Sequence, residues 1–173
     1  MKCRMLIPLV CCSLLVGACA PVATYPARGD NAVSNDPNVA PMPAVVAAAL
    51  SRAVRLYPVD GQYIINLPEG QSLKTAQRIH RDIGDEDGFL ISSNAMKYPV
   101  YHVDRIWVRG DNAQVEVLCP IWPAGTSLDT PAYEREYRRV IFNLEGAFDA
   151  WSVSGVRSFD PGLVEPPQLY GWQ

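Results

Sequence analysis

Apolar residues within Ala44–Tyr57 recur at intervals of three and four positions, the spacing that places side chains on one face of an α-helix. Pro58 stands just beyond this segment and ends the predicted helix. The same spacing predicts a second helix over Leu73–Ile83. Ser72 can cap its first turn, and Gly84 can adopt the left-handed conformation that commonly follows a helix.

Most of the remaining chain alternates apolar and polar residues, the pattern of a strand with one buried face. Gln62–Leu67 is rich in β-branched and aromatic residues and predicts a first strand. A polar loop over Gly84–Lys97 contains one apolar patch, Phe89–Ile91, that fits a short strand. Gly110 and Asp111 belong to the predicted turn of the clearest hairpin. The longer strands are predicted over Tyr98–Arg109, Ala113–Ile121, Tyr133–Leu144 and Trp151–Phe159.

This order of elements predicts an α+β fold, with a curved antiparallel sheet of about four to five strands and two helices packed on one face. The closing hairpin, from Tyr133 to Phe159, resembles the last strands of NTF2-like and cystatin-like domains. That resemblance covers the C-terminal third of the chain and transfers no functional residue. A simple two-layer sandwich, ferredoxin-like or otherwise, is the alternative fold.

The N-terminus has the layout of a secretory signal. Lys2 and Arg4 precede an apolar run over Met5–Val16, and small residues follow it. A helix needs ~20 apolar residues to cross the hydrocarbon core of a membrane, so this run is too short for a permanent span. We therefore expect residues 1–18 to be removed as a signal peptide during export.

The end of this signal, Leu15-Val16-Gly17-Ala18-Cys19, resembles the lipobox of bacterial lipoproteins. The resemblance implies cleavage between Ala18 and Cys19, a diacylglycerol thioether on Cys19, and an acyl chain such as palmitate on its new amine. Two or more acyl chains hold a protein firmly at a bilayer. The alternatives are an ordinary cleaved signal with an incidental cysteine and an uncleaved anchor.

The same resemblance implies a place in the bacterial envelope. Ala20, rather than an aspartate, follows Cys19, which resembles the pattern sorted to the periplasmic face of the outer membrane in Gram-negative bacteria. Residues 19–43 are rich in Pro, Ala and Asn and predict a disordered tether, with a reach on the order of 25–30 Å. A single α+β domain over 44–160 and a Pro-rich tail over 161–173 follow.

Charge and cysteine content exclude several classes of protein. Loss of Lys2 and Arg4 lowers the number of basic side chains from 15 to 13, against 18 acidic ones. An acidic chain is a poor partner for nucleic acid, which requires clustered Lys and Arg. Of the five cysteines, Cys119 remains after the signal and the lipidated Cys19 are set aside. Because it shares the phase of its apolar neighbours, we expect a buried and unreactive thiol.

No catalytic constellation is predicted. The two histidines, His80 and His102, lie in an apolar helix face and in a strand, where structural roles are favoured. A hydrolase-type enzyme that uses either histidine with a carboxylate such as Asp104 is the alternative, although no Gly-x-Ser-x-Gly elbow supports it. The ligand spacings of zinc and calcium sites are also missing, including in the acidic run Asp82–Asp87, so no metal or cofactor is expected.

Two further patterns carry weaker hypotheses. Arg-Gly-Asp-Asn-Ala occurs at Arg28–Ala32 and Arg109–Ala113 and resembles an integrin-binding motif, which would suit an adhesin. Aromatic side chains concentrate on the predicted strands and could line a cleft for a small ligand or a peptide. These aromatic residues are Tyr101, Trp107, Trp122, Tyr133, Tyr137 and Trp151.

Taken together, these features predict a lipid-anchored envelope protein that acts without catalysis, as an accessory, scaffold or binding module. Its expected partners are the membrane, through the acyl chains, and an envelope protein of unknown identity. The ligand-binding residues cannot be assigned from sequence.

Overall fold

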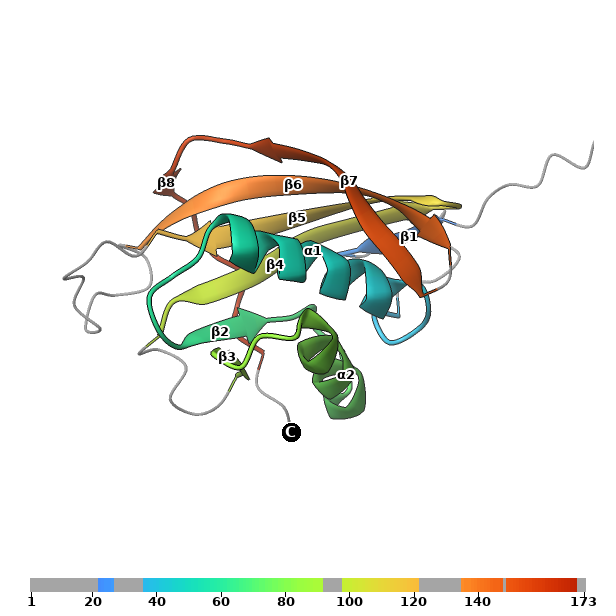
Figure 1. Ribbon diagram of the computed structural model, residues 1–173, viewed down its shortest axis with the longest axis horizontal. Helices are drawn as coiled ribbons and strands as arrows, with labels where there is room; N and C mark the ends of the chain where they lie inside the picture. The colour runs from blue at the N-terminus through green and yellow to red at the C-terminus, as the bar shows by residue number, and fades with distance from the viewer. Residues whose placement is uncertain (1–21, 27–35, 92–97, 122–134, 148, 171–173) are drawn as a thin grey trace, which may run out of the picture.

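A computed structural model of the chain describes residues 22–26, 36–91, 98–121, 135–147 and 149–170. Within these residues the chain forms eight strands and two helices (Figure 1). The elements in order are β1 (Val22–Tyr25), α1 (Met42–Leu56), β2 (Tyr63–Asn66), α2 (Leu73–Ile83), β3 (Gly88–Leu90), β4 (Val100–Arg109), β5 (Asn112–Pro120), β6 (Glu136–Ala147), β7 (Ala150–Ser158) and β8 (Gly162–Leu163).

All eight strands belong to one mixed sheet. Its main order is β3-β2-β4-β5-β6-β7, with β1 paired to β4 and β8 paired to β6. The strands from β4 to β7 form antiparallel pairs, whereas β2 lies parallel to both β3 and β4. Helix α2 makes the crossover between the parallel neighbours β2 and β3, as parallel pairing requires.

The predicted fold class was therefore wrong. We expected an antiparallel sheet of four to five strands with two helices, of NTF2-like, cystatin-like or two-layer type, and found a mixed sheet of eight strands. Two causes explain the error. Parallel pairing of β2 cannot be read from alternation, because all four β2 residues are buried. The short strands β1 and β8 lie in Pro-rich stretches that carry no strand pattern.

Both helices lie where the apolar spacing predicts them. Helix α2 has the predicted bounds, because Ser72 accepts a hydrogen bond from the Thr75 backbone N–H and Gly84 takes a left-handed φ of 71° after the last turn. Helix α1 begins two residues earlier than expected, at Met42, and ends at Leu56. Pro43 is accommodated in its first turn, where no backbone donor is needed.

The sheet has two faces with different roles. On the inner face, apolar residues of β2, β4, β5 and β6 pack against α1 and α2 to form the main core. The rings of Tyr63 and Tyr101 pack edge to face there, with their centroids 5.1 Å apart. The outer face carries the alternate residues of the same strands, and no helix covers it within the described chain. A bulge at Asp104 shifts the register of β4, so that both His102 and Arg105 belong to the outer face.

The first and the last described segments of the chain both join the sheet. Val22–Tyr25, expected in the tether, pairs with β4 from Ile106 to Arg109. After β8, the tail crosses behind the sheet in Figure 1 toward β2, where Leu169 packs against Ile64 and Val100. The predicted signal peptide and lipidation site, residues 1–19, lie outside the described residues. Neither described helix has the length and apolar content that crossing a bilayer requires.

Candidate functional site

One cavity lies on the outer face, beneath residues 162–170, which we call the strap. It has a volume of about 660 Å³, within the range of small-molecule sites. The first residues of β4 and of β6 form its floor, and the strap forms its wall. Its apolar lining is contributed by Val100, Leu163, Val164, Pro166, Pro167 and Leu169, and its polar lining by His102, Arg135, Tyr137, Glu165 and Gln168.

Three polar side chains form a continuous hydrogen-bonded chain, and two of them, His102 and Tyr137, belong to the floor of this cavity. Asn66 Nδ2 lies 3.0 Å from His102 Nδ1, and His102 Nε2 lies 3.2 Å from the Tyr137 hydroxyl. The His102 and Tyr137 rings also pack edge to face, with centroids 5.2 Å apart. His102 is 2% exposed and Tyr137 is 1% exposed, so water does not compete for these bonds.

The strap determines the direction of every bond in this chain. The Gln168 backbone oxygen can only accept, so Asn66 presents its amide nitrogen to it, at 3.0 Å. The Tyr170 backbone N–H meets Asn66 Oδ1 at 3.4 Å, which requires the same amide orientation. Asn66 Nδ2 must then donate its second proton to His102 Nδ1. The neutral imidazole therefore carries its proton on Nε2 and donates it to the Tyr137 oxygen.

The histidine at the centre of this chain is held neutral. Burial, together with the nearby positive charge of Arg135, lowers the pKa of His102 to about 3. Burial also raises the pKa of Tyr137, so its hydroxyl keeps its proton at physiological pH. Because the Tyr137 oxygen already accepts from His102, its own proton is directed elsewhere. The floor thus offers an oriented O–H donor to an oxygen acceptor.

A buried cation stands beside this donor. Arg135 is 8% exposed, lines the cavity, and places Nη1 3.5 Å from the Tyr98 backbone oxygen. Its guanidinium and the Tyr137 hydroxyl both supply hydrogen-bond donors that suit an accepting oxygen, and Glu165 brings a carboxylate to the same lining. The proline and leucine side chains of the wall favour an apolar body attached to the accepting group.

The structure separates the two histidines considered from sequence. His80 lies on α2, in the helical layer, where Nε2 is 2.6 Å from the Gly88 backbone oxygen. His102 lies on the opposite face of the sheet and bonds an amide and a phenol, neither of which is a carboxylate. Asp104, the suggested partner, instead contacts Arg105 at 3.5 Å. This arrangement offers no base activated by a carboxylate at either histidine.

The other candidates from sequence fall away from the cavity. Cys119 is fully buried in the core, and burial raises the pKa of its thiol to about 12. The acidic run ends α2 as a turn, with the Asp87 N–H bonded to Asp85. Among the described residues, no group of three or more His, Cys, Asp or Glu side chains is placed to hold a metal ion. One Arg-Gly-Asp copy, at Arg109, is the β4–β5 turn, and the copy at Arg28 lies outside the described residues.

The aromatic residues that the structure describes lie at several separate places in the fold. Tyr101 lies in the inner core, and Trp151 packs against the same core. Tyr137 lines the cavity under the strap, whereas Trp107 lies at a second hollow on the outer face. Trp122 and Tyr133 lie outside the described residues. Sequence reasoning missed Asn66 and Arg135; a polar residue at the end of an apolar strand was the one available signal for Asn66.

No protein-family model, no curated protein and no solved structure matches this chain. Its function is therefore inferred from the chemistry of the described residues.

Proposed function

We propose that this chain is a lipid-anchored protein of the bacterial envelope that acts without catalysis, as a module that binds a small amphipathic ligand beneath the strap. The lipobox-like segment ending at Cys19 supports the anchor and the export. The cavity supports the binding role, because apolar walls and a few convergent polar groups are the usual composition of a ligand site.

The observation that carries the binding role is the orientation of the Tyr137 hydroxyl. A strap-bound amide fixes a neutral imidazole, which in turn points the phenol proton away from itself. Arg135 adds further N–H donors to the lining of the cavity. The ligand we propose has an apolar body and a carboxylate, phosphate or similar oxygen-bearing head.

The experiment uses two probes with one apolar body and opposite heads, phenylbutyrate and phenylbutylamine. Binding of each to the membrane-extracted chain is measured by isothermal titration calorimetry. We expect phenylbutyrate to bind more tightly than phenylbutylamine, because the Tyr137 proton is directed toward an acceptor, which an ammonium group does not provide. Tyr137→Phe removes this donor, together with the acceptor of the His102 Nε2–H, and should weaken phenylbutyrate binding by about ten-fold or more, the effect of losing a hydrogen bond to a charged group.

Tyr101→Phe is the matched control, because it removes a hydroxyl from a buried tyrosine on the inner face. It should leave the affinity for phenylbutyrate unchanged. Equal binding of both probes, or equal loss of affinity in the two variants, would show that the cavity does not recognise an accepting head.

A further inference from the structure

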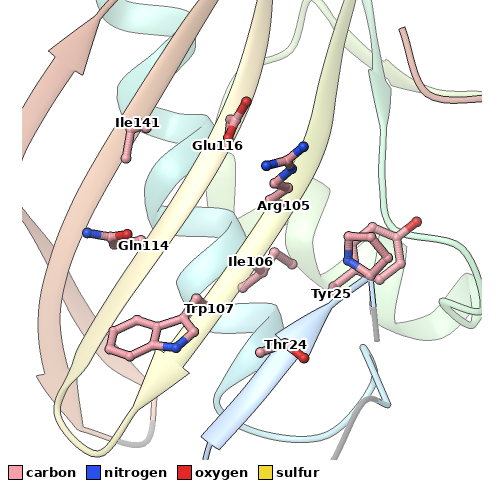
Figure 2. Close-up of a pocket in the computed structure, with 9 residues that line it drawn as sticks. Thr24, Tyr25, Arg105, Ile106, Trp107, Gln114, Glu116 and Ile141 are labelled. Atoms are coloured by element: carbon pink, nitrogen blue, oxygen red, sulfur yellow. The ribbon is translucent and has the colours of Figure 1, made fainter. Parts of the chain in front are cut away.

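A second hollow lies on the outer face, nearer the β4–β5 turn, at the edge where β1 joins the sheet (Figure 2). Its volume is about 370 Å³. Strands β4, β5 and β6 form its floor, and Tyr25 and Pro26 contribute to one wall. The strap residues do not line it, so it is a different site from the cavity described above.

The floor consists of two rows of side chains in register across three strands. Trp107 and Gln114 form the first row, which Asn143 continues on β6 beside the hollow, and Arg105, Glu116 and Ile141 form the second. Neighbours within a row are ~5 Å apart, and the two rows are about 7 Å apart along the strands. Figure 2 shows the Trp107 indole reaching from β4 across to the strand that carries Gln114.

The first row combines a flat apolar surface with amide groups. Trp107 is 38% exposed, although it belongs to a strand whose inner-face residues are fully buried. Gln114 Nε2 donates to Asn143 Oδ1 at 2.9 Å, which holds both amides in fixed positions beside the indole. That bond leaves the Gln114 oxygen as an acceptor and the Asn143 nitrogen as a donor at the surface.

In the second row, each charged side chain has a neighbour of opposite charge. Arg105 lies 3.5 Å from Asp104, and Glu116 lies 2.7 Å from Arg139 on β6. Each guanidinium therefore already faces a carboxylate, and the hollow carries no excess charge toward an anion or a cation. The same planar groups can still give and accept further hydrogen bonds from hydroxyl groups.

We propose that this hollow binds a neutral oligosaccharide. A pyranose ring has an apolar C–H face that can lie on the Trp107 indole, and equatorial hydroxyl or acetamido groups that pair with fixed amide, carboxylate and guanidinium groups. The balanced charge disfavours an anionic ligand. The single exposed indole with Ile141 is a small apolar area compared with what an amphipathic peptide helix would bury.

The test exploits the chain's four tryptophans, which give four indole N–H signals in an NMR spectrum of tryptophan-labelled protein. The mature chain is extracted in a detergent without a sugar head group and titrated with chitotriose and with cellotriose. We expect the Trp107 signal to shift on titration while the Trp151 signal stays in place. An anionic trigalacturonate and a proline-rich peptide are titrated in parallel as competing occupants.

Trp107→Leu keeps an apolar side chain at an exposed position, so it should fold normally, but it removes the flat ring. We expect it to weaken chitotriose binding by about ten-fold or more, and Trp107→Tyr to restore part of the affinity. Trp151→Phe is the matched control on the other face and should bind as the parent does. Absence of binding by either neutral sugar, preferential binding of trigalacturonate or the peptide, or full affinity in Trp107→Leu would overturn the proposal.

Discussion

His102 links the strap to the candidate ligand donor through a single neutral imidazole. Asn66 fixes one ring nitrogen and Tyr137 receives the proton of the other. A charged imidazole would have a donor on both nitrogens, so it would face the Asn66 amide with two donors opposed. The buried position therefore requires the neutral form.

Because of this requirement, the free energy of unfolding depends on pH. The folded pKa of His102, about 3, lies below the ordinary value of 6.5, so the unfolded chain binds an additional proton between these values. The contribution of His102 is complete above pH 6.5 and is lost progressively as the pH falls toward 3. At about pH 4.5 we expect the free energy of unfolding to be lower than at pH 7 by about 2–3 kcal/mol from this group.

Urea unfolding of the parent and of His102→Gln at the two pH values isolates that contribution from those of the carboxylates. Glutamine can accept from Asn66 and donate to Tyr137 but does not titrate. The decrease in the free energy of unfolding on acidification should therefore be smaller in this variant by that amount. Tyr101→Phe, which changes a buried side chain of the inner face and no group that titrates between these pH values, should keep the parental difference. If the free energy of unfolding falls by the same amount on acidification in the parent and in His102→Gln, the imidazole is not held neutral.

At the scale of elements, the side-chain hydrogen bonds between the strap and β2 all involve Asn66. Asn66 donates to Gln168, accepts from Tyr170 and orders His102, whereas Leu169 adds a small apolar contact with Ile64 and Val100. A polar side chain with three partners thus closes one end of the ligand cavity.

We expect Asn66→Ala to loosen the strap while the rest of the sheet persists. The free energy of unfolding should fall by about 1–3 kcal/mol, because the variant leaves buried backbone groups of the strap and the imidazole unpaired. Hydrogen exchange measured by mass spectrometry should become faster in the strap peptides. Asn143→Ala, an asparagine of the outer face that does not touch the strap, should leave strap exchange unchanged; equally slow exchange in both variants would contradict the assigned role of Asn66.

The elements that sequence patterns predicted well are those whose ends are marked by local capping and turn residues. Helix α2 has a serine cap and a glycine after its last turn, and the β4–β5 hairpin has a Gly-Asp turn, with Gly110 at a φ of 62°. The elements that were missed depend on distant partners. β1 and β8 are defined by pairing with β4 and β6, and the cluster under the strap joins residues more than a hundred positions apart.

At the scale of the whole molecule, the position of β1 changes how the proposed anchor would hold the domain. Three positions separate Cys19 from Val22, and an extended chain spans at most about 3.6 Å per residue. Val22 is paired with Arg109, beside the β4–β5 turn. A lipid on Cys19 would therefore hold that end of the sheet within about 11 Å of the membrane, in place of the 25–30 Å tether expected from composition. The Trp107 hollow lies toward the same end.

Export and lipidation of Cys19 are the central claim, because they would place both proposed binding sites at an envelope surface. The most direct measurement is the mass of the N-terminal peptide of the mature protein, isolated from membranes and cleaved with a protease. We expect this peptide to begin at Cys19 and to carry the added mass of a diacylglycerol and one amide-linked acyl chain. A Cys19→Ala chain should lack that mass and leave the membrane fraction. A parent peptide with an unmodified first residue, or one that begins anywhere else, would contradict the account.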